Sequence, residues 1–401
     1  MARTAEKTVA IVAAMRTPIG KYGGALRGLS AVQLGSAAAL SAIGMSGIPA
    51  ADIEEVLFGH GILAGAGQNP ARQVSRAAGI PDTAGATTVN MVCGSGMKAV
   101  HFGFSEIRSG EASRVVVGGM ESMSRAPYLV DGEVRWGVKF GDRPLVDAML
   151  NDSLTDAYGE HESMGLTGER IARKLGLSRA DADAFGLRSS ERALRAVQDG
   201  TFRSEIVPIP PGVVPRSPGL DHDEGPRPDT SMAVLSRLKP TFRPDGILTA
   251  GNSSSLADGG AALVLASAPE VERRGLRPLA WIHSTCVGGV HPSDVMEAPI
   301  PTVTKHLAAT GFAPEEFDRV EHNEAFSSAS IAVMRAFGFT DRQFNVHGGA
   351  IALGHPIGMS GTRIVVTLVH ELVRSNGRLG LATLCMGGGN GLSVIVDRRG
   401  L

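Results

Sequence analysis

The stretch VNMVCGSGMKAV, residues 89–100, is the segment around which the rest of the sequence is organised. Cys93 follows an apolar run and stands in a glycine-rich turn, and helix-forming residues come directly after it. The N–H groups and the dipole at a helix start stabilise a thiolate, which favours a nucleophile. A small buried cysteine, whose glycine neighbours let two elements pack closely, is the alternative. Two later segments, GGAIALGHPIGMSG at 348–361 and LCMGGGNG at 384–391, favour the nucleophile.

Length and composition are those of an ordinary globular protein. The 401 residues suffice for two or three domains, each with its own core. With 43% apolar residues, 20% charged residues and a net charge of −1, nothing indicates nucleic acid or a membrane surface as a partner. The three cysteines are too few for a disulfide framework and too scattered for a zinc site. We therefore expect a cytoplasmic protein without a signal peptide, membrane insertion or a bound metal.

Short apolar runs alternate with helical patterns in the first third of the chain. Strands are expected at 8–14, 55–58 and 114–117, and helices at 29–45, 71–78 and 97–108. This alternation predicts an α/β fold with a mostly parallel sheet that is covered on both faces.

The pattern changes between residues 121 and 250. Helical spacing occurs at 167–175 and 179–198, whereas 208–230 contains seven prolines and must be a loop. We interpret 121–250 as an inserted, lid-like domain. The alternative is a second compact domain without a role at the site.

The C-terminal part of the chain repeats the first part. Residues 48–62 resemble 312–326, CGSGMKAV resembles HPIGMSGTRIV, and RVVVGGMES resembles GLATLCMGGG. Three matches in the same order predict two similar α/β halves whose corresponding loops meet at one cleft. The expected division is residues 1–120 plus 251–275 for the N-terminal half, 121–250 for the inserted loop domain and 276–401 for the C-terminal half.

The candidate chemistry lies in those loops. His355 sits in a glycine-rich turn before a helix, where a neutral imidazole can accept the proton of Cys93. Cys385 is followed by three glycines, whose backbone N–H groups can surround an oxyanion. Asn323 stands in another of these loops. Two thiols and one imidazole suit a covalent acyl step combined with a proton transfer at carbon.

The sequence resembles the thiolase family, the acyl-CoA acetyltransferases. The resemblance rests on seven ordered motifs: GQNPARQ (67–73), VNMVCGSGMKA (89–99), GGMESMS (118–124), TAGNSSSLADGGAA (249–262), HNEAF (322–326), GGAIALGHPIGMSG (348–361) and LCMGGGNG (384–391). It implies the thiolase fold, with two similar βαβ-rich halves in a five-layered αβαβα arrangement and a loop domain that covers the coenzyme. It also implies a homodimer or homotetramer.

The resemblance implies a role for each candidate. Cys93 resembles the nucleophile that becomes acylated, and His355 the base that activates it and helps to bind the thioester oxygen. Cys385 resembles the acid/base that moves the α-proton, and Asn323 the residue that positions a water in that oxyanion hole. The backbone N–H groups of Cys93 and Gly387 resemble the donors of a second oxyanion hole. The implied reaction is reversible CoA-dependent cleavage of a 3-ketoacyl-CoA through an acyl-Cys93 intermediate, with coenzyme A as substrate and no tightly bound cofactor.

The implied coenzyme A contacts come from the inserted domain and the loops beside it. They are Ala250, Gly251, Ser254, Ala325 and Phe326 on the pantetheine side, Arg227 and Phe242 near the adenine end and the pantetheine arm, and Met164 in the lid. Arg227 could instead be a solvated loop arginine. Ser163, Gly168 and Arg170 depart from the family pattern, which bears on acyl-chain preference and on the fit of the lid.

Two further interpretations stay open. A condensing enzyme of the ketosynthase type usually pairs its nucleophile with two histidines or with His and Asn, and Cys385 argues against it. A catalytically silent thiolase-like protein would bind acyl-CoA or act as a scaffold, and the four intact side chains argue against that.

Overall fold

Two α/β halves repeat one order of elements in the computed structural model, which describes residues 8–159, 161–213 and 219–399. The first half contains β1 (Val9–Arg16), β2 (Gly20–Lys21), α1 (Ala31–Ser46), β3 (Glu55–His60), α2 (Pro70–Ala77), β4 (Gly85–Val89), α3 (Ser95–Ser109), β5 (Arg114–Ser122), β8 (Ala257–Ser267) and α7 (Ala268–Arg274). The second contains β9 (Ala280–Gly289), α8 (Pro299–Thr310), β10 (Arg319–His322), α9 (Ser327–Phe337), α10 (Ala350–Leu353), α11 (Ile357–Ser375), β11 (Leu379–Met386) and β12 (Asn390–Asp397).

The strand order confirms the internal repeat. The first half runs β1-β8-β5-β3-β4, and the second runs β9-β12-β11-β10 with corresponding strands in corresponding places. The two sheets join where β1 pairs antiparallel with β9 over Val9–Ile11, which gives one ten-stranded sheet among the described residues. A parallel bridge between Val320 and Phe344 stands where β4 lies in the first half.

The expectation of a mostly parallel sheet is wrong. Strand β3 is parallel to β4 and β5, and β10 is parallel to β11, but β8 and β12 run antiparallel to both of their long neighbours. A parallel neighbour requires a crossover connection, whereas an antiparallel one needs only a turn. The glycines at 387–389 form such a turn between β11 and β12, and β8 enters the sheet after the long insertion.

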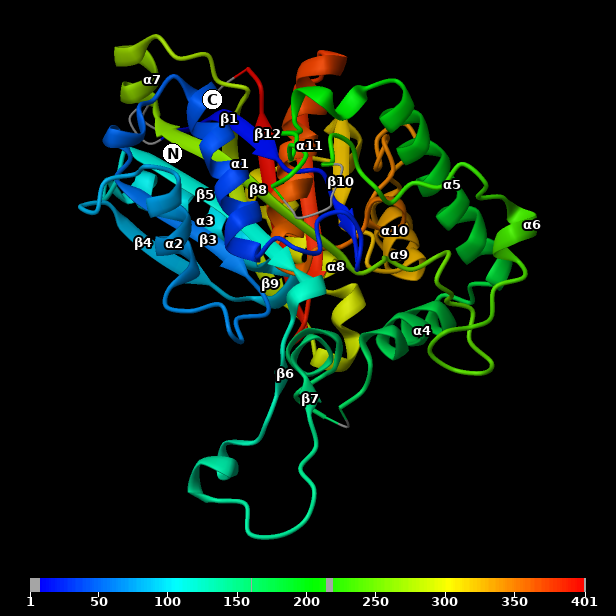
Figure 1. Cartoon of the computed structure of the whole chain (residues 1–401). Helices are drawn as coiled ribbons and strands as arrows, with labels where there is room; N and C mark the ends of the chain where they lie inside the picture. Colours follow the sequence, from blue (N-terminus) through cyan, green and yellow to red (C-terminus); the bar gives the residue numbers. More distant parts are fainter. Residues whose placement is uncertain (1–7, 160, 214–218, 400–401) are drawn as a thin grey trace.

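The elements stack in the five layers αβαβα (Figure 1). Helices α1 and α2 cover the outer face of the first sheet, and α8 and α9 cover that of the second. Helices α3 and α11 lie between the sheets and share one apolar core with both. Residues on all sides of α11 are buried, which is typical of a helix enclosed by protein.

The insertion between β5 and β8 contains α4 (Met164–Lys174), α5 (Arg179–Gln198), α6 (Met232–Leu235) and a small hairpin of β6 (Tyr128–Leu129) and β7 (Val146–Asp147). The hairpin begins a long arm that projects from the body of the molecule (Figure 1). Fully buried ion pairs connect the later part of the insertion to the first half, where Arg16 contacts Glu205 at 2.6 Å and Asp223 at 2.7 Å. Removal of one partner from such a pair strongly destabilises a fold.

Candidate active site

The four candidate side chains lie at the ends of strands or the starts of helices. Cys93 sits in the 3₁₀ turn Val92–Gly94 between β4 and α3, and His355 comes just before α11. Asn323 follows β10, and Cys385 lies near the end of β11. The Asn323 N–H group donates to the carbonyl of Thr383 at 3.2 Å, so Asn323 and Cys385 share one edge of the sheet.

Close packing of two helix starts brings the nucleophile turn and the histidine turn to the same place. A Cβ on Gly96 of α3 would lie 2.5 Å from the Thr362 hydroxyl, and one on Gly361 of α11 would lie 2.6 Å from the Met97 nitrogen. Only glycine fits this approach. The starts of α3 and α11, which Cys93 and His355 precede, therefore lie side by side in the central layer.

The two thiols lie close enough for the charge of one to affect the other. Burial raises the pKa of Cys93 to about 12, the neighbouring Cys385 adds to the rise, and the N–H groups of Gly387 and of Cys93 itself oppose it. Burial also raises the pKa of Cys385 to about 12, and its sulfur lies 3.8 Å from the Met296 sulfur. The expected stabilisation of a thiolate by the helix start is thus outweighed, because loss of solvation is the larger effect.

The imidazole is held by a chain of hydrogen bonds. His355 Nδ1 lies 2.6 Å from the Ser360 hydroxyl, which itself donates to the Pro356 carbonyl and so accepts from Nδ1–H. Nε2 is left unprotonated, 3.4 Å from the Asn323 amide nitrogen. Burial, and then the charge of Arg363, lower the pKa of His355 to about 4. At neutral pH the imidazole is uncharged and available as a base.

Asn323 has capacity left for a further ligand. Its side chain is fully buried, and among the described residues Oδ1 has no hydrogen-bond partner. A buried amide oxygen without a partner is costly unless a water or a substrate binds it.

The expected coenzyme contacts fall into an outer and an inner group. Arg227, Ala250 and Gly251 line a cavity of about 430 Å³ at the edge of the inserted domain. Four others, Met164, Phe242, Ala325 and Phe326, pack in one apolar cluster with Cys385. The Ser254 N–H group donates to the Ala325 carbonyl at 2.9 Å, so the loop at 250–256 connects the two groups.

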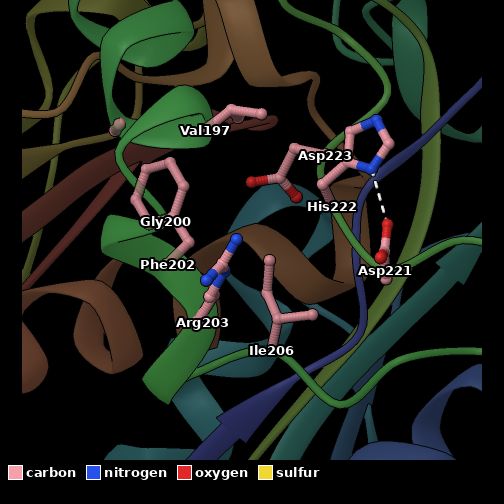
Figure 2. Close-up of a pocket in the computed structure, with 9 residues that line it drawn as sticks. Val197, Gly200, Phe202, Arg203, Ile206, Asp221, His222 and Asp223 are labelled. Atoms are coloured by element: carbon pink, nitrogen blue, oxygen red, sulfur yellow. Dashed lines mark hydrogen bonds and ion pairs between the residues drawn. The ribbon is translucent and has the colours of Figure 1, made fainter.

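A separate cavity of about 260 Å³ is lined by residues of the insertion itself (Figure 2). Phe202 and Arg203 form one side of it, and Asp221 to Asp223 form the other, with His222 bonded to Asp221 at 2.7 Å. None of the site residues expected from the sequence lines this cavity, which is therefore distinct from the candidate active site.

Sequence reasoning missed several neighbours of the candidate residues. Ser360 orients His355 and stands five positions later in the same motif, so the motif contained the signal. Met296 lies next to Cys385, and Met149 belongs to an apolar cluster around Cys93. Neither methionine stands in a recognisable motif. Only the folded chain brings their segments to the site.

Family models match the chain over nearly its whole length. The model of the thiolase N-terminal domain matches residues 9–269, and that of the thiolase C-terminal domain matches 276–398. The chain belongs to the thiolase family. Relatives include an acetyl-CoA acetyltransferase of Pseudomonas aeruginosa, 46% identical over 97% of this chain and 99% of the relative. A probable acetyl-CoA acetyltransferase of Escherichia coli is 44% identical over 98% of this chain and 99% of the relative.

Solved thiolase structures share the fold. The Bacillus anthracis acetyl-CoA acetyltransferase superposes with a TM-score of 0.94 at 38% identity, covering 98% of this chain and 99% of that one. Human mitochondrial 3-ketoacyl-CoA thiolase in complex with CoA superposes with a TM-score of 0.93 at 39% identity, covering 97% of this chain and 98% of that one. Within the described residues of this thiolase, no helix is long and apolar enough to span a membrane, and no group of three His, Cys, Asp or Glu could hold a metal.

The pKa of Cys93 leads to a testable pH profile. Because that pKa is about 12, alkylation of Cys93 by iodoacetamide should speed up about tenfold per pH unit between pH 7 and 10 without levelling. Peptide mass spectrometry separates Cys93 from the other thiols, and a small free thiol, which levels near its own pKa, is the control. A plateau below pH 8 at Cys93 would contradict the burial effect.

Proposed function

We propose that this thiolase catalyses the reversible, CoA-dependent cleavage of a 3-ketoacyl-CoA through an acyl-Cys93 intermediate. The observation that carries the proposal is the close packing of the two helix starts that Cys93 and His355 precede, with Cys385 near enough to raise the pKa of Cys93. The relatives named above as acetyl-CoA acetyltransferases, and the human thiolase solved with CoA, support it.

In the first half-reaction, His355 Nε2 accepts the Cys93 proton while the sulfur attacks the keto carbon. The bond between the α-carbon and the keto carbon then breaks, and its electron pair stays on the α-carbon. Cys385 donates its proton there, so acetyl-CoA leaves and the shortened acyl group remains on Cys93. The N–H groups of Cys93 and Gly387 on one side, and His355 with a water held by Asn323 on the other, are the donors for the negative oxygens.

In the second half-reaction, the thiol of coenzyme A attacks the acyl-Cys93 thioester. Before this attack the His355 imidazolium returns its proton to the Cys385 thiolate, since the pKa of that thiol is far higher. The neutral imidazole then takes the proton of the CoA thiol and passes it to the departing Cys93 sulfur. Both cysteines and the imidazole return to their starting states, so no redox cofactor is consumed. Synthesis runs the same steps backwards.

The high pKa of both thiols fits this cycle. Each cysteine must hold its proton between steps and release it only to a base that is in place. A neutral resting site also keeps the thiols from reacting with passing electrophiles, since the thiolate is the reactive form.

The assay that tests the proposal follows the loss of 3-ketoacyl-CoA absorbance in the presence of CoA. A panel from acetoacetyl-CoA to longer and bulkier 3-ketoacyl-CoA esters is compared by kcat/KM, because specificity is a ratio of those values. Turnover of at least one member is expected. No turnover of any member, despite tight CoA binding, would show a silent acyl-CoA-binding protein.

We propose that the arm joins copies of the chain in a homodimer or homotetramer. Its aromatic side chains are unusually exposed, with Trp136 at 82% and Phe140 at 95%. Large exposed apolar groups on one protruding segment are typical of an interface. The double variant Trp136→Ser, Phe140→Ser should give a smaller particle in light scattering with unchanged helix content. An unchanged mass would contradict this contact.

We further propose the domain division given above and a cytoplasmic location. The β6–β7 arm, α4, α5 and α6 all fall within 121–250, which supports that segment as the inserted domain. The three cysteines are free thiols, and a reaction that uses two of them requires a reducing compartment.

A further inference from the structure

Glu121, at the end of β5, connects the two halves beside the active site. It is fully buried, and Oε2 accepts the N–H groups of Gly61 and Gly358, each at 3.0 Å. Gly61 follows β3 in the first half, whereas Gly358 lies in the first turn of α11 in the second. One carboxylate oxygen therefore holds a loop of one half against a helix start of the other.

On the nucleophile side, the connection continues to Cys93. The Gly61 carbonyl accepts from the Asn90 side chain at 2.9 Å, and the Asn90 side-chain oxygen accepts the Val92 N–H group at 3.0 Å. Val92 has a φ of 50°, a left-handed conformation that a β-branched residue adopts only when its surroundings impose it. The Glu121 chain of hydrogen bonds ends at this residue, which directly precedes Cys93.

On the base side, the same oxygen fixes the turn of His355. Gly358 follows His355 by three positions, with the conformationally restricted Pro356 between them. A Cβ on Gly358 would lie 2.4 Å from the Met120 carbonyl, so α11 and β5 are in direct contact here. A shift of Glu121 would therefore move the start of α11.

His60 lies against the other oxygen of Glu121, which makes no hydrogen bond among the described residues. Its Nε2 lies 3.1 Å from Glu121 Oε1, and only 3% of the residue is exposed. His60 also borders a cavity of about 200 Å³, and its Nδ1 has no partner among the described residues. The buried ring thus limits by contact the space in which the carboxylate can turn.

We infer that Glu121 is a positioning residue for the thiolase reaction, which sets the separation between Cys93 and His355. The inference rests on the proposed roles of Cys93 and His355. A misplacement of reacting groups by about 1 Å costs about 10²-fold in rate, so the effect on turnover should be large.

Two substitutions at one position separate geometry from charge. Glu121→Ala removes the acceptor and should lower kcat about 10²-fold while the KM for CoA stays within about threefold. Glu121→Gln keeps a carbonyl oxygen for the two N–H groups and should restore kcat to within about threefold of wild type. It also removes a negative charge that raises the pKa of Cys93, so alkylation of Cys93 at a given pH should become faster.

A second variant covers the case that Glu121→Ala does not fold. Asn90 is exposed, and Asn90→Ala removes only the link between Gly61 and Val92. It should leave the melting temperature almost unchanged and lower kcat about tenfold. The matched control is Glu205→Gln, an equally buried carboxylate that binds Arg16 and Thr367; it should lower stability but leave kcat of the folded enzyme unchanged.

The outcomes are distinct. Normal kcat in folded Glu121→Ala, an equal loss in Glu121→Gln and Glu121→Ala, or normal kcat in Asn90→Ala would each overturn the positioning role. If Cys93→Ala is inactive in the same experiment, the proposed function survives such a result. Full activity of Cys93→Ala would instead overturn the proposed function itself.

Discussion

Replacement of Cys93 by alanine should reduce thiolysis of acetoacetyl-CoA by about 10⁴-fold or more. The covalent route requires a sulfur at this position, and removal of an enzyme's nucleophile leaves only the residual catalysis of binding and of the oxyanion hole. No other described thiol can take over, because Cys385 is engaged in proton transfer and Cys286 lies outside the cluster. The KM for CoA is measured with the residual activity, or CoA binding is measured directly by calorimetry.

Cys286→Ala is the matched control for that loss. Cys286 is a partly exposed thiol on β9, outside the apolar clusters of described residues that contain Cys93 and Cys385, so its removal should leave kcat within about twofold. Normal CoA binding together with lost turnover in Cys93→Ala would confirm the role of the thiol. Substantial thiolysis by Cys93→Ala would contradict it.

Cys385→Ala should separate the two half-reactions. Loss of a general acid costs about 10²- to 10⁴-fold, and this acid serves only the carbon-carbon step. Cleavage of 3-ketoacyl-CoA should fall by that factor. Transfer of an acetyl group from acetyl-CoA to Cys93 involves no α-proton, so the acetylated enzyme should still form.

The measurement is a comparison of two rates on one preparation. Absorbance reports the cleavage rate, and rapid quenching with peptide mass spectrometry reports the rate of Cys93 acetylation from acetyl-CoA. Cys286→Ala again serves as the control. An equal fall in both rates would contradict a dedicated acid/base role and would indicate that Cys385 supports Cys93 by packing or through its charge.

Local signals in the sequence specified much of the fold. The predicted helix 179–198 coincides with α5, because a capping box formed by Ser178 and Asp181 marks its start. The internal repeat also anticipated the equivalence of α3 with α11 and of β5 with β11. The directions of β8 and β12 could not be predicted from local pattern. The residue pattern of a strand does not show whether its neighbours run parallel or antiparallel to it.

The site could be predicted in part for similar reasons. Cys93, His355 and Cys385 stand in glycine-rich motifs whose chemistry is readable from residue types and spacing. Glu121 stands in such a motif too, yet its contacts come from Gly61 and Gly358, which only the packed halves bring together. The raised pKa of Cys93 could not be predicted from the sequence either, because burial is a property of the whole fold.

Peptide mapping of the enzyme quenched after mixing with acetyl-CoA tests the central claim most directly. We expect one acetyl group, attached as a thioester to Cys93 and removed on addition of coenzyme A. Acetylation of Cys385 or Cys286 in its place, or the absence of any acetylated peptide from an enzyme that turns over, would contradict it.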